Sequence, residues 1–373
     1  MTNFNTKDNG PGNSNSFNTK GMIALGLVLA VAAIIAIYFF TRPSSSNEVA
    51  APTLAPTAAG ATVPLPVISN SANSPVSPVS PVKPQTTSPD QAVLNTLFET
   101  GLGHYQAGAY EEALNSFNEM LALDPLNARA LDARGTILTD QGKLEQAIAD
   151  YTKAIEADPL YPPAYYNRGR VYGLQKKYDQ AIADLRKSFE LAPFFFGYRA
   201  NGNIGRIYHQ QGEYDKALEA FAAAISFDDS KADTYYLRGE TYTAMGNYEA
   251  AISDYEAAIS RFSKYHQAYQ SLGYARYKTG QFEQALESFD KAIELSPTSP
   301  TPHFYRMLVY LATNQVDKTK AEVAQGMETI GALPEEEQAL LFKRILGDLE
   351  SFAQENPAQA KDVEALVNLI PPQ

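Results

Sequence analysis

Residues 128–161 read ARALDARGTILTDQGKLEQAIADYTKAIEADPLY, and this pattern of 34 residues returns along the chain. Each copy has a glycine in its first half and an alanine in its second half. The glycines are Gly101, Gly135, Gly169, Gly205, Gly239 and Gly273, and the alanines are Ala113, Ala147, Ala181, Ala217, Ala251 and Ala285. Both series keep a spacing of 34 residues and share a single spacing of 36 between the third and fourth copies. Two columns that keep one period and one slip indicate an array of structural repeats.

Each copy is typical of two antiparallel helices. In the quoted copy, Leu131 and Gly135 fall four residues apart and therefore share one helical face. Gly142 suits the left-handed residue that ends a helix. A second periodic run passes through Tyr151 and has to end before Pro159. The small residues let two helices approach closely beside an aromatic ring. Because one pair cannot bury both its faces, neighbouring pairs should stack into a solenoid.

These columns resemble the tetratricopeptide repeat. Its small–small–aromatic–alanine–proline signature is present as Gly135, Ala147, Tyr151, Ala154 and Pro159, and again as Gly273, Ala285, Phe289, Ala292 and Pro297. The resemblance covers residues 94–299 and weakens over 300–333, where Thr319, Val323 and Gly326 replace the small, aromatic and alanine residues. It implies an all-α fold, a right-handed α-solenoid of helix-turn-helix repeats. Residues 94–333 would form six clear units and a degenerate seventh.

The N-terminal residues predict a membrane anchor. Residues 1–20 are polar and are expected to form a disordered tail. Residues 21–40 carry no charge, and as a helix they would span about 30 Å, the thickness of the hydrocarbon core of a bilayer. A cleaved signal peptide would have a shorter apolar core, and a buried helix would not lie between two polar flanks. We therefore predict a single transmembrane helix over 21–40.

Charged residues around this span set its expected orientation. Lys7 and Lys20 precede the span, whereas only Arg42 closely follows it. The positive-inside rule then places the N-terminus inside the cell and the repeats outside the cytoplasm, anchored to the plasma membrane. Cytoplasmic repeats are the alternative.

Two further segments flank the repeats. Residues 43–91 contain ten prolines and predict a semi-extended Pro/Ser/Thr-rich linker, either a spacer or a docking site for a proline-recognising domain. Residues 334–373 carry an apolar face that includes Leu341, Ile345, Leu349 and Phe352. Capping helices are expected here, because a solenoid has to cover the apolar face of its last unit. A homodimer through that face is the alternative.

Composition narrows the classes of function. The chain has 30 Lys and Arg against 42 Asp and Glu, a net charge of −12, and no cysteine. An acidic surface repels phosphate backbones, so we expect no nucleic-acid partner. Glycines that lie 34 residues apart form no phosphate-binding loop. The four histidines lie in four different units without the spacing of a metal site. We predict no catalytic residue, no cofactor and no metal, and hence no enzyme.

The first helices of the units are the expected binding surface. The resemblance implies that they line a concave groove that holds a peptide. Asn167 with Arg170 and Asn203 with Arg206 repeat one spacing in adjacent units, and each pair shares a helix face. Such a patch suits an acidic segment or a free C-terminus of a partner protein. Pairing of both arginines with carboxylates such as Glu240 is the structural alternative. The predicted partner-binding residues are Tyr166, Asn167, Arg170, Arg199, Asn203, Arg206, His209, Tyr236, Tyr274 and Tyr277.

Two other features call for a structural explanation. Pro193 is expected to end a helix, which leaves Phe194, Phe195 and Phe196 in a lengthened loop, packed in the core or exposed as a contact site. Arg134, Arg168 and Arg238 directly precede the glycine of their units and are expected to snorkel to solvent.

The sequence therefore predicts a membrane-anchored scaffold. It would bind a protein or peptide partner in its groove and assist complex assembly at the cell envelope, with no covalent step. The alternatives are a self-associating structural assembly subunit, or a non-catalytic accessory of an envelope enzyme.

Overall fold

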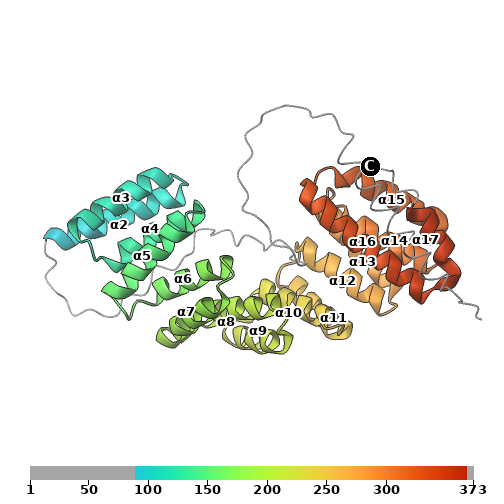
Figure 1. Ribbon diagram of the computed structural model, residues 1–373, viewed down its shortest axis with the longest axis horizontal. Helices are drawn as coiled ribbons and strands as arrows, with labels where there is room; N and C mark the ends of the chain where they lie inside the picture. Colours follow the sequence, from blue (N-terminus) through green and yellow to red (C-terminus); the bar gives the residue numbers. More distant parts are fainter. Residues whose placement is uncertain (1–88, 368–373) are drawn as a thin grey trace, which may run out of the picture. The chain divides into compact units, whose positions relative to one another are not determined.

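The structure is a computed structural model that describes residues 89–367 (Figure 1). The tail predicted over 1–20, the span predicted over 21–40 and the linker up to residue 88 lie outside the described residues. Between residues 89 and 367 there are sixteen α-helices, one short 3-10 helix and no strand, an all-α helical repeat fold. The helices belong to two compact parts, which divide between Gly280 and Gln281.

In the first part, a first helix and a second helix alternate along the chain. The first helices are α2 (Pro89–Gln106), α4 (Ala128–Asp140), α6 (Pro162–Leu174), α8 (Pro193–Gln210), α10 (Ala232–Ala244) and α12 (His266–Lys278). The second helices are α3 (Tyr110–Leu123), α5 (Leu144–Ala157), α7 (Tyr178–Leu191), α9 (Tyr214–Phe227) and α11 (Tyr248–Arg261). Helix α2 begins three residues inside the predicted linker, because a proline is well tolerated in the first turn of a helix.

The two helices of a unit approach closely at the repeated glycine. A Cβ atom placed on Gly135 would lie 2.7 Å from the ring of Tyr151, and one on Gly239 would lie 2.7 Å from the ring of Tyr255. The alanines of the second column are fully buried in the first part: Ala113, Ala147, Ala181, Ala217 and Ala251. The predicted packing of small residues against an aromatic ring is confirmed here. Only a residue without a Cβ fits the first position, since atoms cannot overlap.

The turn between the two helices needs a left-handed residue. Gly142 has a φ of 72°, as its sequence position predicted. The third unit has Lys176 at the equivalent position with a φ of 58°. A side chain in this region costs about 1–2 kcal/mol, so the surrounding helices hold this turn in place.

The two extra residues between the third and fourth units lengthen a helix, so the prediction of a loop after Pro193 is wrong. Pro193 begins helix α8, and only Ala192 separates α8 from α7. Pro193 needs no hydrogen-bond donor at this position, since the first turn of a helix leaves its N–H groups unpaired. Phe196 is buried and Phe195 half-buried, whereas the side chain of Phe194 is 99% exposed.

The arginines that precede the glycines form ion pairs, which corrects the prediction that they snorkel to solvent. Arg134 donates from Nε and Nη2 to the two carboxylate oxygens of Asp150, at 2.7 and 2.8 Å. Its Nη1 donates to Asn118 Oδ1 of the preceding unit at 2.8 Å. Arg168 with Asp184 and Arg238 with Asp254 make the same two-pronged contact. The aspartates are buried, so each arginine supplies the partner that a buried charge requires.

The fourth unit lacks this ion pair and lacks both of its members. Ile204 stands at the position of the arginine and Ala220 at that of the aspartate. Ile204 is buried, and Ala220 packs against the same apolar cluster. The charged pair is thus replaced as a whole, as expected where a lone buried charge would be unfavourable.

The second part begins with α13 (Phe282–Leu295) and α14 (Thr301–Ala312). It continues with α15 (Val316–Ile330), α16 (Glu335–Glu355), the 3-10 helix η1 (Pro357–Gln359) and α17 (Ala360–Val367). Phe304 and Leu308 of α14 are buried. Helix α16 covers α14, and the rings of Phe304 and Phe342 lie 6.5 Å apart.

The apolar face of α16 is buried within the same chain. Leu341, Ile345, Leu349 and Phe352 are each less than 8% exposed. The face on which the dimer alternative rests is therefore already covered. None of the helices within residues 89–367 combines the length and apolar character that crossing a bilayer requires.

The ion pairs predict a non-additive response to mutation. Asp150→Ala should lower the free energy of unfolding by about 2–3 kcal/mol, because Arg134 is left half-buried without a counter-ion. The double variant Arg134→Ile with Asp150→Ala reproduces the fourth unit and should recover most of that loss. Urea denaturation followed by circular dichroism measures both. Equal losses for the single and double variants would contradict this account of the pair.

Candidate partner-binding site

Side chains on one face of the first helices α4, α6, α8 and α10 form what we call the first-helix wall. Its residues include Asp132, Asn167, Arg170, Asn203, Arg206 and His209. Successive first helices are neighbours along the first part. Arg129 of α4 lies over the ring of Phe98 of α2, with its guanidinium carbon 4.1 Å from the ring centre. His209 Nδ1 of α8 lies 3.0 Å from Thr241 Oγ1 of α10. The wall residues therefore connect one unit to the next.

The two predicted asparagines make the same connection. Asn167 Nδ2 of α6 donates to Asp132 Oδ1 of α4 at 2.9 Å. Asn203 Nδ2 of α8 donates to Tyr166 Oη of α6 at 3.2 Å and to its own helix at Arg199 O. The amide nitrogens are thus used within the fold. Each amide oxygen can still accept a hydrogen bond, since an amide offers two donors and one acceptor oxygen.

The predicted arginines do meet on the wall. Arg170 of α6 and Arg206 of α8 are half-buried, and neither forms a hydrogen bond or ion pair with another residue of 89–367. Arg170 lies over the ring of Tyr166, 5.8 Å from its centre. The alternative in which both arginines pair with carboxylates such as Glu240 is not realised. Glu240 Oε1 instead accepts from the hydroxyl of Tyr255.

The two guanidinium groups act on each other electrostatically. Burial lowers the pKa of Arg206 from its usual value, and the positive charge of Arg170 lowers it further. Both effects disfavour the charged form of Arg206, and the second is the electrostatic repulsion between the two guanidinium groups. An anion placed between the two groups would relieve this repulsion and provide the hydrogen-bond acceptors that the guanidinium groups lack.

The remaining predicted residues have other environments. Arg199 lies over the rings of Phe195 and Tyr198. Tyr274 and Tyr277 are half-buried, with ring centres 6.4 Å apart.

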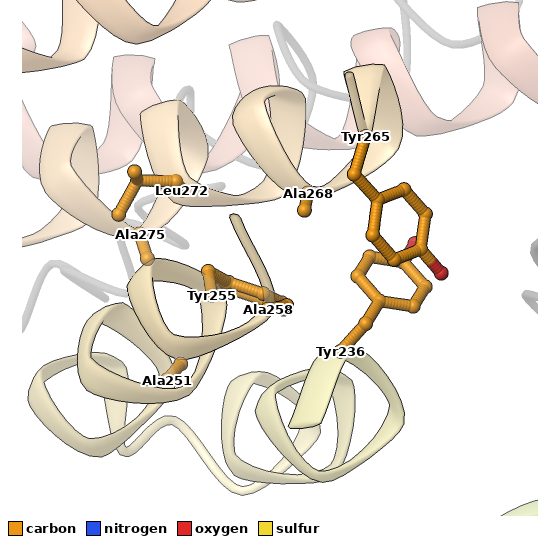
Figure 2. Packing of buried hydrophobic residues seen from close by; sticks show 8 residues of the cluster. All are labelled: Tyr236, Ala251, Tyr255, Ala258, Tyr265, Ala268, Leu272 and Ala275. Atoms are coloured by element: carbon orange, nitrogen blue, oxygen red, sulfur yellow. The ribbon is translucent and has the colours of Figure 1, made fainter. Parts of the chain in front are cut away.

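Tyr236 was predicted to bind a partner, but its side chain is 2% exposed and belongs to the core. It packs against Tyr255 and Tyr265, and Figure 2 shows these rings with the small residues around them. Tyr236 shares the helix position of Tyr166, but here Tyr265 from the next unit covers it, with ring centres 5.0 Å apart.

Asp132 is a half-buried carboxylate on the wall. Burial raises its pKa from 3.8 to about 6, although hydrogen bonds from Asn167 and Tyr161 act in the opposite direction. No cation is paired with it among the described residues. Ionisation of Asp132 at neutral pH therefore lowers the stability of the folded protein.

Two residues near the arginine pair were not predicted. Asp233 and Tyr265 both raise the pKa of Arg206. Asp233 occupies the position in its unit that Arg129 and Arg199 occupy in theirs, so a comparison of the repeat columns would have placed it on the wall. Tyr265 precedes a first helix, as Tyr161 does in an earlier unit. Within residues 89–367, no three His, Asp or Glu side chains gather in an arrangement that could hold a metal ion.

Comparisons with known families identify the repeat. A family model described as "TPR repeat" matches residues 135–176 and 205–246. Two models described as "Tetratricopeptide repeat" match residues 236–300 and 162–195. This chain contains tetratricopeptide repeats. No curated protein sequence matches the chain at a significant level.

Solved structures are similar to the tetratricopeptide repeat region. The crystal structure of MamA is 30% identical over 44% of this chain and 94% of that chain, with a TM-score of 0.41. The pilF protein of Pseudomonas aeruginosa is 19% identical over 58% of this chain and 97% of that chain, with a TM-score of 0.52. A tetratricopeptide repeat protein of Parabacteroides merdae is 19% identical over 68% of this chain and 99% of that chain, with a TM-score of 0.51. The last two share the fold.

Asp132 should make stability depend on pH. Its folded-state pKa lies above its unfolded-state value, so the folded protein binds more protons between about pH 4 and pH 6, and its contribution to stability is lost as the pH rises through this range. Asp132→Asn keeps the hydrogen-bond acceptor and removes the charge. The variant should be more stable than the wild type by about 1–2 kcal/mol at pH 8 and by about half as much at pH 5.

Urea denaturation of both proteins at the two pH values measures this effect. Asp215→Asn, at an exposed position of α9, removes the same charge and controls for net charge. A gain for Asp132→Asn that is equal at pH 5 and pH 8 would show that ionisation of Asp132 is not its cause.

Proposed function

We propose that this chain is a scaffold that binds an acidic segment, or a free C-terminus, of a partner protein at Arg170 and Arg206. The observation that carries this proposal is the pair of half-buried guanidinium groups, neither of which forms an ion pair or hydrogen bond with another residue of 89–367. Buried charges in proteins are generally paired, and a guanidinium matches a carboxylate with two parallel hydrogen bonds. Binding needs no covalent step.

Other arginines of the chain support this interpretation. Arg134, Arg168 and Arg238 directly precede the repeated glycine, and each has its own aspartate. Arg170 and Arg206 come from first helices of the same kind but point to the wall. Each of these three arginines thus has an aspartate at hydrogen-bonding distance, whereas no carboxylate among residues 89–367 makes such a contact with Arg170 or Arg206. A carboxylate from outside the chain would complete the set.

The surrounding charge favours selective binding. The chain carries a net charge of −12, so a partner with an acidic segment is repelled by most of the surface and attracted at the arginine pair. Charge complementarity at one place in an otherwise repulsive field contributes more to specificity than to affinity.

The N-terminal residues give this scaffold a location. The uncharged stretch 21–40 would anchor the chain in the plasma membrane, and the proline-rich residues 43–91 would hold the repeats at a distance from it. With two lysines before the span, the repeats would lie outside the cytoplasm. In this arrangement the scaffold would assist complex assembly at the cell envelope, as a non-catalytic partner.

Selection of peptides tests the proposed site directly, and the natural partner need not be identified first. Random twelve-residue peptides displayed on phage would be selected against the full chain in detergent micelles. Peptides retained by the wild type should be enriched in Asp and Glu, because these place a carboxylate between the two guanidinium groups. The variant Arg170→Glu with Arg206→Glu should lose this enrichment and bind the selected peptides at least about tenfold more weakly.

Lys143→Glu with Lys153→Glu is the matched control. Both lysines are exposed, precede or lie on the second helix α5, and change net charge by the same amount. This control should retain the wild-type peptides. Wild-type selection without an acidic bias, or equal loss in the two double variants, would overturn the proposal.

Self-association is a second candidate, and exposed apolar side chains favour it. Leu126, Leu160 and Phe194 each directly follow the proline that comes after a second helix, one unit apart, and are 67%, 73% and 99% exposed. A row of this kind is typical of a contact surface. A second copy of the chain could cover it with its own row.

Sedimentation measurements test this candidate. If the row joins two copies, the full chain should dimerise with increasing concentration, and Phe194→Asp should weaken the dimer about tenfold or more, since a charge would enter an apolar contact. Leu174→Asp, at another exposed leucine, should have little effect. A wild-type chain that stays monomeric would exclude this candidate.

A further inference from the structure

Asp233 faces the arginine pair from the next unit. It lies in the first turn of α10, is exposed, and forms no ion pair with another described residue. Its position in the unit is that of Arg129, whose side chain reaches back to Phe98 on the preceding first helix. Helix α10 is a neighbour of α8, which carries Arg206, and the negative charge of Asp233 is near enough to raise the pKa of Arg206.

Tyr265, which directly precedes α12, is the third residue of the group that Arg206 and Asp233 begin. Its side chain is 4% exposed, and its buried hydroxyl group has no well-oriented hydrogen-bond partner. Burial raises the pKa of Tyr265, the nearby carboxylate of Asp233 raises it further, and Arg206 lowers it. The rings of Tyr265 and Tyr236 are tilted against each other, and their hydroxyls lie at the same end of the pair (Figure 2). Arg206, Asp233 and Tyr265 therefore gather from three successive units.

The charges of Arg170, Arg206 and Asp233 sum to a small positive value. Arg170 and Arg206 contribute two positive charges, and Asp233 contributes one negative charge. Asp233 lies at the N-terminus of α10, where the helix dipole favours an acidic side chain. A ligand that carries one negative charge neutralises the net charge of these three side chains. A doubly charged ligand leaves an excess of negative charge beside Asp233.

We propose that Asp233 is a specificity-determining residue, which makes the arginine pair accept a single carboxylate in preference to a phosphate group. The inference rests on the proposed function, since it concerns the ligand of the same site. A phosphate carries about −1.5 to −2 charges at neutral pH and three acceptor oxygens, so two arginines alone would favour it. Asp233 opposes this preference, because its repulsion of an anion grows with the charge of that anion.

Two synthetic peptides provide the test. The first is the most enriched acidic peptide from the phage selection, labelled with fluorescein. The second is the same peptide with phosphoserine in place of the acidic residue that contributes most to binding. Fluorescence anisotropy with the full chain in detergent micelles gives the dissociation constant of each peptide for the wild type and for Asp233→Asn.

Asp233→Asn should strengthen binding of both peptides by unequal factors. Two charges several ångströms apart at a protein surface interact weakly, so we expect about a threefold gain for the carboxylate peptide and about a tenfold gain for the phosphoserine peptide. The preference of the wild type for the carboxylate should shrink or reverse. Asp215→Asn is the matched control, because Asp215 also lies in the first turn of its helix but on a second helix, α9.

The outcomes separate this inference from the proposed function. If the wild type binds the acidic peptide through Arg170 and Arg206, but Asp233→Asn changes the ratio of the two dissociation constants no more than Asp215→Asn does, the role of Asp233 is refuted and the function stands. If the selection yields no acidic peptide, the function itself fails, and the role of Asp233 fails with it. A wild type that prefers the phosphoserine peptide would also refute the inference.

Discussion

The close approach of two helices at a repeated glycine is the contact on which the rest of the fold depends. At Gly135 and Gly239 the backbone of the first helix nearly touches an aromatic ring of the second. Any side chain there would push the helices apart, because a close-packed interior cannot absorb a methyl group without displacement. The distance between the two helices of a unit fixes where the first helix lies. It thereby fixes the positions of Arg170 and Arg206 relative to each other.

The sequence predicted the repeats well, since their period is a local property that recurs in six copies. It predicted less where one residue type serves two purposes. Pro193 can follow a helix or begin one, and only the packing of Phe196 into the core shows that it begins α8. Tyr236 and Tyr166 share a column, yet Tyr265 buries only the former. Whether the two arginines form ion pairs depends on which carboxylates lie within reach of them. That is a property of the tertiary structure, which the spacing of residues in the sequence does not predict.

Two kinds of arginine lie on the first helices and differ in their partners. The arginine before the glycine points toward the second helix, where an aspartate sixteen residues later meets it in three units. The arginine after the glycine points to the wall, where neither Arg170 nor Arg206 forms an ion pair with another residue of 89–367. Because the fourth unit lost both members of the first pair together, Ile204 and Ala220 show which charges belong to the fold. The arginines that form no ion pair on the wall are the ones at which we propose that a partner binds.

The hydrogen bonds that link first helices join only successive units, as from Asn167 to Asp132 and from Asn203 to Tyr166. An array of this kind opens from its ends, since a terminal unit has one neighbour and an interior unit has two. Helices α6 and α8 are interior, with α4 before them and α10 after them. Thermal fraying would therefore reach the guanidinium pair last, and the proposed binding surface would keep its geometry while the outermost repeats open.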